Sequence, residues 1–493
     1  MRITYTPIVK KRPKADLLVV PFWQGKKAEA ACSLSLFSSE IQAVLRKGDF
    51  QGTLGETCLV YTSKKPEGRL LLLGLGKKRE ASAETMRKAA SSSVSVCRQK
   101  KWERLNFFCP EDSFYHSALA EGFLLAGYEF QALKHDSLKE GKVTSLKAVC
   151  LVGPDSSFAK ECKRKTTIVQ AVNFARDLVN GNADDITPQK LCEVAMGMKK
   201  EHSFLKVTIL GKRELTKEGL GLLLAVNRAS FRDPALIILE YKGDPSSKEY
   251  TAIVGKGITY DTGGLNLKPG SSMETMKDDM SGAAAVLGTI QAVASLQLGV
   301  NVLGVIPTTE NAIGSKSYKP GDVYRSYSGK MVEIVDTDAE GRLVLADAIS
   351  YVQDRYPVQR LIDLATLTGA IVVALGEHVS GLFSNHDGLA KELFEAGEIS
   401  FERVWRMPMY AEYKEALRST LADIKNCGDR KASSITAAIF IESFIKNIPW
   451  AHLDIAGTAY LSKPAFYHTT PATGVGVRLL VEYFTRRCKK SSS

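Results

Sequence analysis

Short apolar runs alternate with longer amphipathic stretches over roughly the first third of the chain. The short runs have the length and composition of buried strands, and they lie at residues 17–21, 58–61, 70–75, 105–108 and 148–152. Between them, residues 83–99 and 114–128 are long enough for helices and contain no proline. This pattern predicts a small α/β domain, and no residues in it indicate chemistry.

The alternation becomes stronger in the remainder of the chain. Apolar strands are expected at residues 252–254, 302–306, 332–335, 361–364 and 453–455. Helices are expected at residues 283–296, 343–353 and 435–445. Apolar strands separated by helices predict a mostly parallel central sheet covered by helices on both faces. In such sheets, functional residues gather at the carboxyl ends of the strands.

A chain of 493 residues is too long for one ordinary core, so we predict two domains. The N-terminal α/β domain is expected over residues 1–152 and the larger catalytic α/β domain over residues 186–493. A linker helix and turn should occupy residues 153–185, because the turn signal Asn180-Gly181-Asn182 follows a helical stretch.

Charge and cysteine content restrict the possible partners and compartment. The chain has 66 Lys plus Arg against 54 Asp plus Glu, a formal charge of +12. Because the basic stretches are short and no basic-aromatic module accompanies them, nucleic acid is not an expected partner. No run approaches ~18 apolar residues, so no membrane span is expected. Nine cysteines without a Cys-x-x-Cys pair, and no secretory signal, predict reduced thiols in the cytoplasm.

One segment with candidate chemistry begins where the strand at 252–254 ends. Lys256 and Asp261 follow that strand, and nearby glycines let the backbone approach a ligand closely. Lys268 comes next, and Asp279 stands just before a run of small residues, near the expected start of a helix.

A second segment, residues 336–343, follows the strand expected at 332–335. In extended backbone, residues i and i+2 point the same way, so Asp338 and Glu340 would present two carboxylates to one point. On a helix the two side chains would diverge by about 200°. We therefore expect extended backbone from Asp338 to Glu340.

Together the two segments contribute four carboxylates whose mutual repulsion calls for cations, and hard divalent metals are suited to this. Near two dications the ammonium of Lys256 would be disfavoured, so a neutral amine could serve as a ligand. Lys268 and Arg342 then remain as cations that can polarise a carbonyl or stabilise an oxyanion. Taken singly, each residue has a simpler interpretation: a helix cap, a solvated loop lysine, or an arginine paired with a nearby carboxylate.

The residues of both segments resemble the signatures of the leucyl aminopeptidase (cytosol aminopeptidase) family. The matching stretches are Lys256-Gly-Ile-Thr-Tyr-Asp-Thr-Gly-Gly, Met276-Lys-Asp-Asp279-Met and Asp336-Thr-Asp-Ala-Glu-Gly-Arg-Leu343. Further blocks of similarity lie at residues 176–180, 365–370, 405–408, 422–426 and 452–458. The resemblance covers about residues 170–480 and is much weaker in the N-terminal part.

The resemblance implies a metal-dependent exopeptidase with two divalent ions per subunit, Mn²⁺ or Zn²⁺. Asp261 and Glu340 would bridge the two ions. One ion would also bind Lys256 and Asp279, and the other would bind Asp338. The free α-amine of the substrate would bind one metal, which explains the removal of a single N-terminal residue.

The same resemblance implies the remaining roles and the assembly. Lys268 would polarise the scissile carbonyl, and Arg342 would help to hold a bicarbonate ion that acts as general base. The family assembles as hexamers, so a homohexamer acting on peptides with a free N-terminus is expected. The pocket for the first side chain, which suits Leu, Met or another apolar residue, would be lined by Met276, Thr366, Gly369 and Ala456.

Some positions depart from the family pattern without removing a ligand or catalytic group. Asp336 stands where the family usually has Asn, Ser281 replaces a usual Gly, Asn266 a usual Ser, and Gly181-Asn182 a usual Thr-Pro. Asp336 adds a carboxylate beside the site, which bears on metal preference and pH optimum.

Three alternatives remain from the sequence. A basic hexamer that binds DNA would show Lys and Arg clustered on one assembled face. A paralogue that only scaffolds is disfavoured because every expected ligand and both catalytic cations are present. A two-metal phosphatase would use similar carboxylates, but a lysine ligand and the lack of His among the candidates argue against it. We interpret His378 and His452 as structural.

Overall fold

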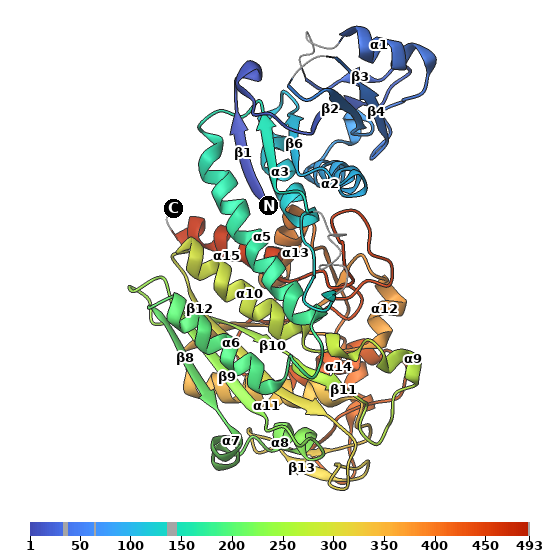
Figure 1. Cartoon of the computed structure of the whole chain (residues 1–493). Helices are drawn as coiled ribbons and strands as arrows, with labels where there is room; N and C mark the ends of the chain where they lie inside the picture. The colour runs from blue at the N-terminus through green and yellow to red at the C-terminus, as the bar shows by residue number, and fades with distance from the viewer. Residues whose placement is uncertain (33–37, 64–65, 136–144, 492–493) are drawn as a thin grey trace. The chain divides into compact units, whose positions relative to one another are not determined.

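The computed structural model describes residues 1–32, 38–63, 66–135 and 145–491, which form two compact units (Figure 1). The first unit comprises Met1–Val169 together with Lys463–Thr470. The second comprises Gln170–Ser462 and Pro471–Ser493. The predicted two-domain α/β fold class is confirmed. Among the described residues, no helix has the length and apolar content needed to cross a membrane.

The first unit contains a seven-stranded sheet of order β1-β7-β6-β2-β5-β4, with β3 paired to β2. Its strands are β1 (Arg2–Thr6), β2 (Leu17–Trp23), β3 (Glu29–Ala30), β4 (Thr57–Tyr61), β5 (Arg69–Gly74), β6 (Arg104–Phe108) and β7 (Ala148–Val152). Its helices are α1 (Ser38–Lys47), α2 (Ala83–Lys100) and α3 (His116–Ala126), with 3-10 turns η1 (Val9–Lys11), η2 (Lys78–Glu80) and η3 (Ser113–Tyr115). Each predicted apolar run is a strand. The pattern missed β1, β3 and α1. Strand β1 escaped because its residues are exposed or half-buried and alternate in polarity.

The second unit contains a nine-stranded sheet of order β17-β16-β19-β15-β10-β12-β9-β8, with β11 paired to β12. Its strands are β8 (Leu205–Leu210), β9 (Ala235–Lys242), β10 (Tyr250–Gly255), β11 (Gly257–Asp261), β12 (Asn301–Asn311), β15 (Val358–Ala365), β16 (Ser380–Ser384), β17 (Val404–Arg406) and β19 (Trp450–Asp454). Strands β19, β15, β10, β12 and β11 run parallel at the centre. Their carboxyl ends therefore share one edge of the sheet.

Two long helices, α10 (Ser281–Leu296) and α11 (Glu340–Arg355), cover opposite faces of this sheet (Figure 1). A side chain at Gly304 of β12 would come within 2.9 Å of Ile290 on α10. The neighbouring Leu303 and Val305 instead join the buried cluster that contains Leu345 of α11. Helix α5 (Phe158–Asn180) contains the boundary between the two units. The remaining helical elements are α6 (Pro188–Glu201), α7 (Lys212–Glu218), α8 (Gly221–Asn227), α9 (Gly270–Met273), η4 (Met276–Asp278), α12 (Gly369–Leu375), α13 (Asp387–Ser400), η5 (Ala411–Leu417), α14 (Ser433–Glu442) and α15 (Val477–Ser491).

One predicted strand does not belong to the central sheet. Residues 331–333 form β14 (Met331–Glu333), which pairs with β13 (Val323–Arg325) and β18 (Ile424–Lys425) in a separate three-stranded sheet. The interpretation of residues 332–335 as a central strand is therefore wrong. Of the three residues in β14, only Val332 is buried, as befits a short strand in a small sheet.

Candidate metal centre

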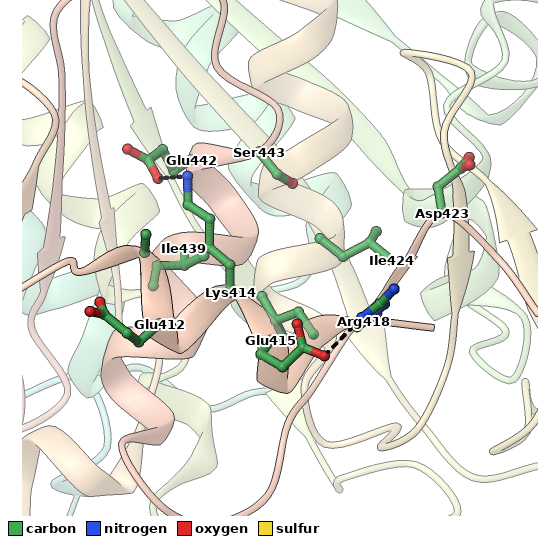
Figure 2. Close-up of a pocket in the computed structure, with 11 residues that line it drawn as sticks. Glu412, Lys414, Glu415, Arg418, Asp423, Ile424, Ile439, Glu442 and Ser443 are labelled. Carbon is green, nitrogen blue, oxygen red and sulfur yellow. Dashed lines mark hydrogen bonds and ion pairs between the residues drawn. The ribbon is translucent and has the colours of Figure 1, made fainter. Parts of the chain in front are cut away.

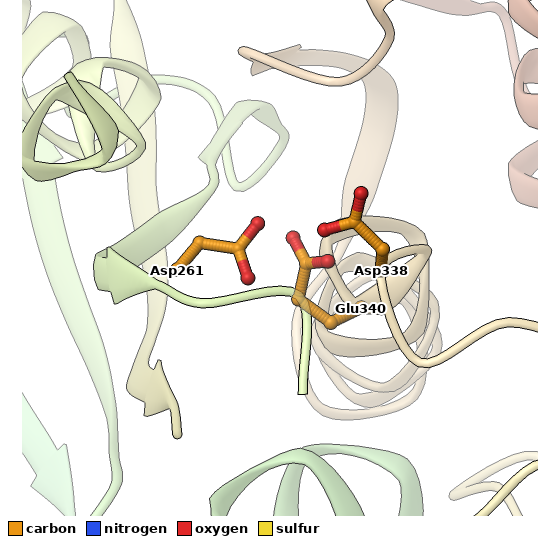
Figure 3. Close-up of side chains that lie close together, drawn as sticks. All are labelled: Asp261, Asp338 and Glu340. Atoms are coloured by element: carbon orange, nitrogen blue, oxygen red, sulfur yellow. The ribbon is translucent and has the colours of Figure 1, made fainter. Parts of the chain in front are cut away.

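Three carboxylates converge at the carboxyl edge of the central strands (Figure 3). Asp261, Asp338 and Glu340 each offer an oxygen within 4.8 Å of the others. Asp261 is the last residue of β11, and Glu340 is the first residue of α11. Asp261 and Glu340 are buried, whereas Asp338 is half-buried. A largely buried group of like charges is therefore built from two distant parts of the chain.

The backbone that brings Asp338 to Glu340 differs from the prediction. Extended backbone was expected, but Asp338 lies in a turn, and Ala339 caps α11 with φ −106° and ψ 41°. The expectation failed because it assumed that the preceding strand continues, whereas β14 ends at Glu333. The carboxylates meet across the start of a helix, where the helix dipole favours negative charge.

Lys256 lies between β10 and β11 and is buried among these carboxylates. Its Nζ is 2.7 Å from Asp279 Oδ1 and 2.7 Å from Glu340 Oε1, and it donates a hydrogen bond to Thr366 O at 3.1 Å. Desolvation lowers the pKa of Lys256, but the carboxylates of Asp279, Glu340 and Asp261 outweigh it and raise the pKa above its usual value. The two carboxylate contacts at 2.7 Å therefore favour the ammonium form of Lys256.

Lys268 pairs with the other side of the carboxylate group. Its Nζ is 2.9 Å from Asp261 Oδ2 and 2.6 Å from Asp338 Oδ1. Desolvation again lowers the pKa, and the carboxylates, Asp261 foremost, raise it above its usual value. The four carboxylates are thus held by two lysine ammoniums.

The donor set has capacity for further cations. Among the described residues, the buried Asp279 Oδ2 and Glu340 Oε2 have no hydrogen-bond partner. Burial foremost, and the neighbouring carboxylates after it, raise the pKa of Asp279 well above its usual range and that of Asp338 to about 7. A buried carboxylate oxygen without a partner costs free energy unless the carboxylate is protonated or that oxygen binds a cation. Because hard divalent ions prefer carboxylate oxygens, the residues present fit such ions.

Arg342 lies on α11, two residues beyond Glu340, and is buried. Its Nη1 donates to Asn426 O at 2.9 Å, and its Nε has no partner among the described residues. No carboxylate in the described part of the chain forms an ion pair with it, so the simple paired-arginine interpretation does not hold. Desolvation lowers the pKa of Arg342, which indicates a cation in a dry environment.

Two of the predicted pocket residues, Thr366 and Ala456, lie on loops that follow central strands at the same edge. Thr366 follows β15, and its Oγ1 donates to Asp279 Oδ1 at 2.7 Å. The amide nitrogen of Ala456 donates to Asp454 Oδ1 at 3.2 Å, and the same oxygen accepts from Leu367 N at 3.1 Å. Asp454 therefore joins the loop after β15 to the loop after β19.

Met276 stands three residues before Asp279, and Gly369 stands three residues after Thr366. Met276 begins η4, and its carbonyl accepts from Asp279 N at 3.5 Å. Gly369 begins α12, where an added Cβ would meet no atom within 4 Å among the described residues. The space beside Gly369 is therefore open.

Sequence reasoning missed Asn311, which contacts the cluster, and the role of Thr337, which contacts the loop after Asp261. Asn311, at the end of β12, donates from Nδ2 to Asp261 Oδ1 at 2.7 Å and to Thr337 O at 3.1 Å. Thr337 Oγ1 donates to Gly263 O at 2.7 Å. A signal was present: the apolar β12 ends in the polar run Thr308-Thr309-Glu310-Asn311, at the same sheet edge as Asp261.

A separate pocket of about 680 Å³ lies between η5, β18 and α14 (Figure 2). Two ion pairs border it, Lys414 with Glu442 at 3.8 Å and Arg418 with Glu415 at 3.1 Å. None of the three clustered carboxylates lines this pocket. The candidate metal centre is therefore a different site.

Fold and site together define a class: a two-unit α/β enzyme whose carboxylate centre lies where parallel strands end. Comparison with known proteins then identifies the family. Residues 173–481 match the catalytic domain of the cytosol aminopeptidase family, and residues 19–137 match its N-terminal domain. The chain therefore belongs to the cytosol aminopeptidase family and is a metal-dependent aminopeptidase, which sets aside the phosphatase alternative.

Full-length relatives and a solved structure agree with this assignment. The chain is 48% identical over 490 residues to a probable cytosol aminopeptidase of Protochlamydia amoebophila, covering 98% of both chains. It is 46% identical over 495 residues to a probable cytosol aminopeptidase of Chlamydia trachomatis serovar A, covering 97% of this chain and 98% of the relative. The bottromycin maturation enzyme BotP in complex with Mn has a TM-score of 0.85 at 31% identity, covering 96% of this chain and 100% of BotP.

Proposed function

We propose that this protein is a two-metal aminopeptidase that removes one residue, preferably Leu, Met or another apolar residue, from peptides with a free N-terminus. The observation that carries the proposal is the convergence of Asp261, Asp338 and Glu340 beside two lysines. BotP was solved with Mn, which supports manganese in a related fold, with zinc as the other candidate.

The five donors divide into two groups around the shared carboxylates. Asp261 and Glu340 would bridge two divalent ions, with Lys256 and Asp279 on one side and Asp338 on the other. When bound, such ions supply an activated water and a polarised scissile carbonyl. Lys256 would then lose its proton, because two dications would repel its ammonium and would neutralise the carboxylates that stabilise it.

Lys268 would act on the substrate rather than on the metals. Its ammonium is held between Asp261 and Asp338, so its charge is fixed at the edge of the cluster. A fixed cation there can stabilise the oxyanion that develops on the scissile carbonyl, and such preorganised donors typically contribute ~10²–10³ in kcat.

Arg342 would hold the general base. It is a buried cation with an unpartnered Nε and no ion-paired carboxylate among the described residues, so it suits a small anion. Arg342 would hold bicarbonate at this point, and the bound anion would supply the general base. The free-energy cost of burying a guanidinium that forms no direct ion pair among the described residues supports an anion at this point.

The first side chain of the substrate would lie against the loops that carry Met276, Thr366, Gly369 and Ala456. Thr366 is hydrogen-bonded to Asp279, so this side of the proposed pocket is joined directly to the candidate metal centre. An apolar pocket discriminates by only ~1–3 kcal/mol per methylene, and broad specificity for apolar residues is therefore expected.

A homohexamer in the cytoplasm is the proposed working form. Exposed apolar side chains on α12, Val372 and the 90%-exposed Val373, are of the kind that assembly buries. The described cysteines form no disulfide, which suits a reducing compartment.

The test is release of leucine from a leucyl peptide by the purified full chain. Dialysis against a strong chelator should abolish hydrolysis, and Mn²⁺ or Zn²⁺ should restore it. Acetylation of the peptide's N-terminus should remove turnover, because the free amine is part of the recognised group. Full activity without metal, or equal rates on blocked and free peptides, would contradict the proposal.

A further inference from the structure

Asn311 is fully buried at the end of β12, directly beside the end of β11. In the pairing of these strands, Asp261 is the register partner of Asn311. The Nδ2 group of Asn311 donates to Asp261 Oδ1 at 2.7 Å and to Thr337 O at 3.1 Å. One amide group therefore joins both chain segments that carry the clustered carboxylates.

The contacts of the Asp261 carboxylate are divided between its two oxygens. Oδ1 accepts from Asn311 Nδ2 and, at 2.8 Å, from Gly263 N. Oδ2 lies 2.9 Å from Lys268 Nζ and faces the cluster. Two N–H donors on Oδ1 fix the rotation of the carboxylate, so Oδ2, which pairs with Lys268, is the oxygen presented to the cluster.

A second set of contacts joins the loop after β11 to the turn before α11. Thr337 Oγ1 donates to Gly263 O and accepts from Asn266 N at 2.9 Å. Gly264 has φ +65°, and an added Cβ there would lie 2.8 Å from Thr337 Oγ1 and 3.2 Å from Asn311 Oδ1. The β11 loop and the turn before α11 are therefore packed without spare room around the Asn311 amide.

We propose that Asn311 is a positioning residue of the metal centre. It orients Asp261 and holds the turn that precedes Glu340 at a fixed separation from β11. This inference rests on the proposed two-metal function. A buried amide that only supported the fold would affect stability alone, whereas a positioning residue sets metal affinity as well, typically by 10–100-fold.

The test measures Mn²⁺ affinity of the full chain by competition with a fluorescent chelator, beside thermal unfolding in the presence of excess chelator. Asn311→Ala should weaken Mn²⁺ binding about 10–100-fold. Asn227→Ala is the matched control, because Asn227 is also buried and its Nδ2 donates to Arg232 O at 2.8 Å and Thr309 Oγ1 at 3.0 Å. It should lower the melting temperature similarly and leave Mn²⁺ affinity unchanged.

Each outcome decides the inference. If Asn311→Ala and Asn227→Ala bind Mn²⁺ as tightly as wild type, the positioning role is wrong while the two-metal function stands. If wild type itself neither binds Mn²⁺ nor requires metal, the proposed function fails and the inference with it. Should Asn311→Ala not fold, Asn311→Ser provides the same comparison, because its shorter hydroxyl cannot reach both Asp261 and Thr337.

Discussion

Lys256 Nζ lies 2.7 Å from Glu340 Oε1, although one residue follows β10 and the other begins α11. Gly341 makes this approach possible. A Cβ at residue 341 would lie 2.6 Å from Lys256 Cε and 2.8 Å from its Nζ. The lysine therefore passes over the first turn of the helix at a distance that only glycine allows.

Gly341→Ala should damage the site more than the fold. The new methyl group displaces the Lys256 side chain from Asp279 and Glu340, while the helix itself gains up to about 1 kcal/mol in propensity. We expect a melting temperature within a few degrees of wild type and at least a tenfold loss of kcat/KM. Thermal unfolding and steady-state hydrolysis of a leucyl peptide measure the two effects.

Gly197→Ala is the matched control for this prediction. Gly197 lies within α6, and an added Cβ meets no described atom within 4 Å. This variant should keep full activity and be as stable as wild type or slightly more stable. Equal activity of the two alanine variants would show that Lys256 does not need its observed position.

Asp336→Asn tests the carboxylate that departs from the family pattern. Asp336 Oδ1 accepts a hydrogen bond from Asp338 N at 2.8 Å, and an asparagine carbonyl can accept the same bond. The change therefore removes charge without removing the contact. Mn²⁺ affinity should fall roughly two- to fivefold, since a nearby half-exposed charge contributes about 0.5–1 kcal/mol. Chelator competition measures it, with Asp322→Asn, whose carboxylate pairs with Lys319, as control.

The apolar pattern predicted four of the nine strands of the central sheet, β10, β12, β15 and β19, because buried parallel strands are continuous apolar runs. The runs at 252–254, 302–306 and 361–364 all fall within strands of that sheet. The pattern reports burial and not the pairing partner. Val332 is as buried as a central strand residue, yet β14 belongs to a separate sheet.

The polar end of β12 marks Asn311 as a candidate, but its role could not be predicted from that signal. It depends on the register between β11 and β12, which places Asn311 beside Asp261, 50 residues away in the sequence. Similarly, the meeting of Asp338 and Glu340 depends on the helix that begins at Glu340. Residue type identified the carboxylates, whereas long-range register and the start of a helix determined their arrangement.

The buried pair of His452 and Asp363 should make stability depend on pH. His452 Nδ1 lies 2.6 Å from Asp363 Oδ1, and Trp450 Nε1 donates to the other oxygen at 2.7 Å. Desolvation lowers the pKa of His452, but Asp363 and then Asp454 outweigh it and raise the pKa. The folded protein therefore binds this proton more tightly than the unfolded chain does. The contribution of the protonated His452 to the free energy of unfolding is complete below about pH 6.5, and it is lost as pH rises through the folded pKa of His452.

Asp363→Asn should consequently be most destabilising in acid. At about pH 6 the loss should be roughly 3–5 kcal/mol, because a buried charge is left without its partner. As pH rises through the folded pKa of His452 the loss should shrink, since the ring becomes neutral in both proteins. Urea unfolding at several pH values measures this difference. A pH-independent difference would mean that His452 is neutral in the fold throughout.

The two lysines of the site should respond differently to removal, although both pair with carboxylates in the structure. Lys256 contacts Asp279 and Glu340 from a buried position, so Lys256→Ala should weaken binding of one metal. Lys268 is 15% exposed at the cluster edge, so Lys268→Ala should retain two metals and lose kcat by roughly 10²–10³. Metal content by mass spectrometry beside steady-state kinetics separates the roles.

Lys414→Ala is the control for both variants, because Lys414 pairs with Glu442 in the separate pocket of Figure 2. It should change neither metal content nor kcat by more than about twofold, since a largely exposed ion pair contributes at most ~1 kcal/mol. The assignment depends on geometry: a neutral amine at Lys256 has a free lone pair for a metal, whereas Lys268 must stay protonated to stabilise an oxyanion. If Lys268→Ala loses a metal while Lys256→Ala keeps both, the roles of the two lysines are reversed.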